Sequence, residues 1–172
     1  TIATAKAAQA RDPAWLDGWI EKLTDPQPGE RRLAQLRLRA GGTVAIMRLM
    51  ERLLGSDMAT DPKVGEGMLA GTIAEFGDEG VESLRAACLV ADPQRAARVY
   101  YGIAEIPGQV FSAEVGAGLA SSVLTSEQRS ALAEIVSRRY AKLPTPEAIE
   151  QFLASRFATK LADYQQSRAP SA

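Results

Sequence analysis

Apolar side chains recur every three or four residues along most of the chain, which is the spacing of one face of an α-helix. Near the start, a predicted helix begins at Asp12-Pro13 and ends near Thr24, and its apolar positions share one face: Trp15, Leu16, Trp19, Ile20 and Leu23. No stretch alternates apolar and polar residues for long enough to form a strand. The pattern therefore predicts an all-α fold.

Turn and capping residues divide this pattern into about nine helices. After the first, we expect helices over 29–40, 44–54, 61–76, 81–91, 93–106, 112–123, 125–143 and from Thr145 onward. Asp-Pro pairs mark several starts, because the aspartate accepts hydrogen bonds from free N–H groups and the proline fits the first turn. Ser112 is expected to cap one helix, and Thr125 with Gln128 has capping-box spacing.

The central stretch, 61–92, predicts a helix covered on two sides. Large side chains occupy one half of the helix over 61–76, and small ones such as Ala70 and Ala74 occupy the other. A surface helix would instead carry one apolar stripe and a charged back. The glycines at 65, 67 and 71 each cost about 1 kcal/mol relative to alanine, and we expect close backbone packing to offset this. The alternative interpretation is that 61–76 forms the central helix of an ordinary helical bundle.

The Asp-Pro pairs at 25, 61 and 92 are 36 and 31 residues apart, a period typical of helical solenoids. The terminal helices are one-sided and the middle ones two-sided, as a stack with capped ends requires. Two segments carry a resemblance to bacterial HEAT-repeat proteins, DPKVGEGMLAGTIAEFGDEGVESL and DPQRAARVYYGIAEI. In that family an Asp-Pro turn precedes an inner helix, and a glycine joins the two helices of a repeat.

The resemblance covers roughly residues 25–122 and implies a short right-handed α-α superhelix, a HEAT-like solenoid. An arginine often follows the family's aspartate by three or four places, and Arg95 fits, whereas Gly65 stands there in the central unit. We expect a flexible lead-in over 1–11, one helical-repeat domain over 12–168 and a tail over 169–172. Within the domain, a repeat-like core over 25–122 precedes a helical hairpin over 125–168, which either continues the stack or packs against its end.

Residue usage excludes several kinds of catalysis. The 172 residues include no histidine, no asparagine and one cysteine, Cys88. Catalytic triads containing histidine, histidine-bound metals and multi-thiolate clusters are therefore excluded within this chain. We expect Cys88 to be a small buried hydrophobe. The sequence predicts no enzyme activity, no cofactor and no metal site.

The charge distribution is uneven although the net charge is −1. Between Arg31 and Arg52 there are six arginines and one acid, Glu51, whereas 57–92 holds eight acids and two basic residues. Such asymmetry either attracts an oppositely charged protein or orders copies of this chain. Alternatively, it serves only solubility and ion pairing between nearby residues of a helix. Near-zero net charge and few aromatic residues disfavour nucleic acid. We expect no membrane span and no signal peptide in this sequence, which does not indicate a compartment.

The resemblance implies a non-catalytic interaction or scaffold module whose concave face binds a protein partner. Inner-helix residues would line that face, so the predicted partner-binding residues are Arg95, Arg98, Tyr100 and Tyr101. One alternative is an accessory domain of a larger enzyme, and another is a HEAT-like nucleic-acid-binding protein or DNA glycosylase. The identity of the partner and self-association stay open.

Overall fold

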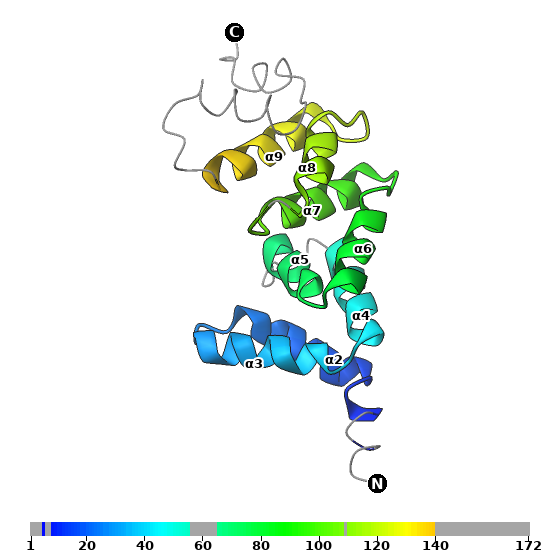
Figure 1. Ribbon diagram of the computed structural model, residues 1–172, viewed down its shortest axis with the longest axis vertical. Helices are drawn as coiled ribbons and strands as arrows, with labels where there is room; N and C mark the ends of the chain where they lie inside the picture. Colours follow the sequence, from blue (N-terminus) through cyan, green and yellow to red (C-terminus); the bar gives the residue numbers. More distant parts are fainter. Residues whose placement is uncertain (1–4, 6–7, 56–64, 109, 140–172) are drawn as a thin grey trace. The chain divides into compact units, whose positions relative to one another are not determined.

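A computed structural model describes residues 5, 8–55, 65–108 and 110–139 of the chain (Figure 1). The chain divides into two compact units, unit 1 (Thr1–Leu84) and unit 2 (Arg85–Ala172). All regular structure in the described residues is helical, which confirms the all-α prediction over that part. The last helix from Thr145 and the tail over 169–172 lie outside the described residues. The helix predicted from Asp61 begins instead at Glu66, because Gly65 before it has an extended backbone and is its N-cap.

The described helices follow the predicted order closely. They are α2 (Pro13–Glu21), the 3₁₀ turn η1 (Lys22–Thr24), α3 (Pro28–Arg39), α4 (Thr43–Leu54), α5 (Glu66–Ala74), α6 (Asp78–Ala87), α7 (Pro93–Ala104), α8 (Ser112–Leu119) and α9 (Ser126–Arg139). The unit boundary falls within α6. The solenoid arrangement and the single domain over 12–168 stay predictions.

Three of the predicted side-chain caps form, at Asp12, at Asp92 and at Thr125. Asp12 accepts hydrogen bonds from the backbone N–H groups of Ala14 and Trp15 at 2.7 and 3.2 Å. Asp92 accepts one from the N–H of Arg95 at 2.9 Å. Thr125 and Gln128 bond to each other's backbone N–H groups, which completes the capping box. These local bonds satisfy N–H groups that a helix leaves free at its start.

Two other predicted helix starts are also wrong in detail. Phe111, not Ser112, is the N-cap of α8, and its side chain makes no capping bond. The helix predicted over 81–91 begins earlier, because α6 already starts at Asp78. Gly77 has a φ of 78°, a left-handed conformation that glycine adopts without the steric penalty of a Cβ. The chain therefore reverses between α5 and α6 in the three residues 75–77, with Gly77 in the left-handed conformation.

The core of unit 1 forms around α4, which contacts both α2 and α5, while α2 also packs against α3. Figure 1 shows α2 and α3 side by side. The largest fully buried side chains here come from every helix in the group: Leu16, Ile20, Leu23, Leu38, Leu49, Leu53, Ile73 and Leu84. Each such burial contributes about 1.5–3 kcal/mol relative to exposure. The apolar faces predicted from the sequence are the faces that form the core.

In α5, no residue is exposed, as the two-sided pattern leads one to expect. The close backbone packing expected at the glycines of this stretch is nevertheless absent at Gly65 and Gly71. A Cβ added at Gly65 or Gly71 would meet nothing within 4 Å, and Gly65 lies before the helix as its N-cap. The close approaches occur instead at Gly41, Gly80 and Gly118, each buried.

Unit 2 contains a group of three helices in which α7, α8 and α9 contact one another. Its largest fully buried side chains are Ile103, Leu124 and Leu132. The buried face of α7 is rich in small residues, including Ala96 and Ala97, so neighbouring helices can approach it closely. This packing decides where the predicted binding residues of α7 lie.

Candidate partner-binding surfaces

The four predicted binding residues do not share one exposed face of α7. Arg95 is exposed, Arg98 and Tyr101 are half-buried, and Tyr100 is buried with 6 % of its surface exposed. The hydroxyl of Tyr101 donates a hydrogen bond to the carbonyl of Gln128 in α9 at 3.3 Å. Tyr100 therefore serves packing within unit 2, and partner binding stays a prediction for Arg95, Arg98 and Tyr101.

Tyr100 lies in a crowded environment. Its ring covers Gly118 of α8, and its hydroxyl donates to the carbonyl of Cys88 at 3.3 Å. Burial raises the pKa of Tyr100 and raises the pKa of the Cys88 thiol to about 12. Because the thiolate is the nucleophilic form, Cys88 is a poor nucleophile at neutral pH. It is half-buried rather than fully buried.

An ion pair between Arg85 and Glu114 lies close to Tyr100 and Cys88. Arg85 Nε lies 2.9 Å from Oε1 of Glu114, and its Nη2 donates to the carbonyl of Val110 at 3.3 Å. Glu114 is a smaller cause of the raised pKa values of Cys88 and Tyr100, since its negative charge disfavours further ionisation. The ion pair holds the Arg85 side chain against α8 within unit 2.

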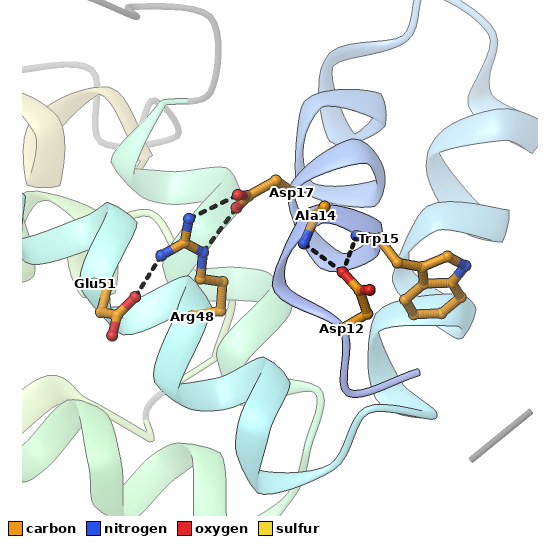
Figure 2. A network of polar contacts seen from close by, with 6 residues as sticks. All are labelled: Asp12, Ala14, Trp15, Asp17, Arg48 and Glu51. Atoms are coloured by element: carbon orange, nitrogen blue, oxygen red, sulfur yellow. Dashed lines mark hydrogen bonds and ion pairs between the residues drawn. The ribbon is translucent and has the colours of Figure 1, made fainter. Parts of the chain in front are cut away.

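In unit 1, a polar network connects α2 to α4 (Figure 2). Arg48 Nε and Nη2 donate to the two carboxylate oxygens of Asp17 at 2.8 and 2.6 Å, and Nη1 donates to Glu51 at 2.7 Å. Paired bonds of this kind are stronger than single neutral ones. The hydrogen bonds from Arg48 lower the pKa of Asp17. Sequence analysis missed this pair because the two residues are 31 positions apart.

Replacing Asp17 with asparagine is expected to lower the free energy of unfolding at pH 7 by about 1 kcal/mol, since both partners are about one-third exposed. A carboxyl whose pKa is depressed by folding stabilises the protein above its unfolded pKa, about 3.9, and loses this contribution as pH falls through the folded value. The difference between wild type and D17N should therefore be constant near neutral pH and shrink below about pH 4. Urea unfolding at several pH values measures it.

Glu21→Gln on the same helix is the matched control, because Glu21 is exposed and makes no ion pair with the described residues. It should leave the free energy of unfolding almost unchanged at every pH. A stability gap for Asp17→Asn that persists undiminished at pH 3 would contradict a contribution from the ionised carboxylate.

Two tryptophans of α2 lie at the edge of the unit 1 core. The rings of Trp15 and Trp19 meet edge to face with centroids 5.9 Å apart, and both are half-buried. Lys22 and Arg37 lie over the Trp19 ring at 4.9 and 5.9 Å. Such cation–π contacts contribute about 0.5–1 kcal/mol at exposed sites. The pair packs at the edge of the core, and the Trp19 ring is covered by two cations of this chain.

The exposed side of α3 carries a leucine between two arginines. Arg32, Leu36 and Arg39 follow at intervals of four and three residues, which places them on one face, and all three are exposed. Leu36 is 51 % exposed. We call these three residues the α3 surface. The opposite side of the helix, with Ala34 and Leu38, is buried.

The arginines of α3 differ in what they contact. Arg31 donates to the carbonyls of Asp25 and Pro26 at 2.7 and 3.1 Å, so it stabilises the turn before the helix. Arg32 forms an ion pair with Glu75 at 3.1 Å, yet remains 57 % exposed. Arg39 has no ion pair within the described part of the chain. Arg32 and Arg39 therefore keep donors that face solvent.

Within the described residues, no cluster of three or more acids, cysteines or histidines is arranged to hold a metal ion. The same residues contain no helix long and apolar enough to cross a membrane. Comparisons with protein-family models, with curated proteins and with solved structures found no match to this chain.

Proposed function

We propose that this chain is a non-catalytic protein-binding module built from helices stacked in HEAT-like pairs. The observation that carries the proposal is the α3 surface, where Leu36 is exposed between two solvent-facing arginines. Protein interfaces are enriched in arginine and in apolar anchors relative to the remaining surface. Elsewhere on α3 the large apolar side chains, Leu33 and Leu38, are half-buried or buried.

Three features support the HEAT-like stacking. Short turns join α3 to α4 and α5 to α6. Asp-Pro pairs start α2 and α7 with the caps that such turns supply. The middle helix α5 leaves no residue exposed, as a helix inside a stack should.

The nucleic-acid alternative has weaker support. Of the arginines on α3, Arg31 is bound to backbone carbonyls, Arg32 is paired with Glu75, and Arg37 covers Trp19. Stacking of bases needs open aromatic faces beside a basic groove. The Trp19 face is occupied by cations from this chain itself.

A photo-crosslinking side chain at position 36 tests the proposal. In the cells that produce the protein, we expect discrete protein adducts from position 36 and none from position 89. Leu89 is a matched control because it is an exposed leucine, 86 % accessible, in unit 2. Identical adducts from both positions, or none from either, would overturn the proposal.

A further inference from the structure

We infer that the α3 surface binds an acidic amphipathic segment, one in which carboxylates lie about one helical turn on either side of an apolar side chain. This deepens the proposed function and rests on it. The partner is thus a protein helix or peptide with an acidic residue, an apolar anchor and a second acidic residue on one face.

The geometry of α3 sets this pattern. Arg32, Leu36 and Arg39 span two helical turns of one face, and the burial of Ala34 and Leu38 fixes which side faces solvent. A partner helix lying along this stripe would place residues at similar intervals against it. Its central residue would cover Leu36, and its outer residues would meet the two guanidinium groups.

Charge complementarity selects carboxylates for those outer positions. A guanidinium has five N–H donors. In Arg32 the described contacts engage one nitrogen, Nη1, which bonds to Glu75 and Gln35. The remaining nitrogens and the whole of Arg39 are open to carboxylate oxygens, which match a guanidinium with two parallel bonds.

The central leucine disfavours a nucleic-acid backbone as the occupant. Phosphates would meet Leu36 with charged oxygens and would leave its exposed surface, 51 %, without an apolar partner. An acidic amphipathic peptide supplies both the carboxylates for the two arginines and an apolar side chain that covers the leucine.

The test uses the full chain and a labelled helical peptide with Glu, Leu and Glu at intervals of three and four residues. Fluorescence anisotropy measures its affinity, and a scrambled peptide of the same composition serves as the control ligand. We expect Arg39→Glu to weaken binding about tenfold or more and Leu36→Ser to weaken it several-fold. Replacing by lysine only the peptide glutamate that faces position 39 should restore binding to Arg39→Glu, because Arg32 still requires a carboxylate.

Matched variants separate a local contact from a general charge effect. Arg138→Glu makes the same change of net charge at an exposed arginine of α9, and Leu89→Ser removes an exposed leucine. Both should bind the peptide within about twofold of wild type. Since all four side chains are exposed, circular dichroism and thermal unfolding should be unchanged.

Several outcomes would overturn the inference. One is that Arg138→Glu loses as much affinity for the peptide as Arg39→Glu, and another is that wild type binds the scrambled peptide as tightly. The others are that wild type does not bind the peptide, or that duplex DNA at equal charge concentration displaces it. Self-association that Arg39→Glu abolishes would assign the surface to a second copy instead. If the peptide fails while crosslinking at position 36 still captures a protein, this inference falls and the proposed function stands.

Discussion

Replacing Gly80 with alanine is expected to lower the free energy of unfolding by about 3 kcal/mol. Gly80 is buried in the first turns of α6, where a Cβ would overlap the carbonyl oxygen of Ile73 and lie 2.9 Å from its carbonyl carbon. Backbone atoms of α5 cannot rotate away as a flexible side chain can. The turn between α5 and α6 would therefore have to open, which separates Ile73 from the core that it occupies.

Urea unfolding followed by circular dichroism measures this loss. The matched control is Gly71→Ala in α5, where an added Cβ meets nothing within 4 Å. Alanine should stabilise that helix by up to about 1 kcal/mol, because glycine is the poorer helix former. The two substitutions are chemically identical and should change stability in opposite directions. Equal stability of Gly80→Ala and wild type would show that α5 and α6 are not in close contact at this point.

Gly118→Ala is expected to destabilise the protein by about 2 kcal/mol through the same cause in unit 2. A Cβ at Gly118 would lie 2.6 Å from Cδ1 of Tyr100 and 2.9 Å from Cγ and Cε1. Those atoms belong to a buried ring whose hydroxyl bonds to the Cys88 carbonyl, so the ring cannot shift without losing this bond. Thermal unfolding should report a lower Tm.

A double-mutant cycle tests whether Tyr100 is the clashing group. Tyr100→Val removes the ring and should itself destabilise unit 2, because a buried aromatic side chain is lost. In that background, Gly118→Ala should have little further effect. Strictly additive losses would place the strain elsewhere, since additivity is the behaviour of residues that do not interact.

Helix positions and caps could be predicted because they depend on residues close together in the chain. The helix predicted from Asp12 to Thr24 matches α2 with η1, and the capping box at Thr125 forms with both of its bonds. In each case the atoms that decide the outcome lie within four positions of one another. The expected cap at Ser112 was wrong, and the helix begins there without any side-chain cap.

The candidate sites were much less predictable. Tyr100 and Tyr101 are neighbours in sequence and similar in chemistry, yet one is buried against Gly118 and the other lies half-exposed against α9. The α3 surface was contained in the run of arginines from 31 to 52. Which of those arginines still face solvent depends on distant partners such as Asp17 in α2 and Glu75 at the end of α5.

The sequence by itself therefore determined that the described chain is helical, where most of its helices begin and which apolar faces they bury, since periodicity and capping are local properties. Only the tertiary structure decided which glycines are indispensable to packing. A Cβ is excluded by atoms from another helix, as at Gly80 and Gly118, and no local pattern distinguishes these from Gly71. The tertiary structure also decided that Arg39 is exposed, because this depends on the way α3 packs on α2.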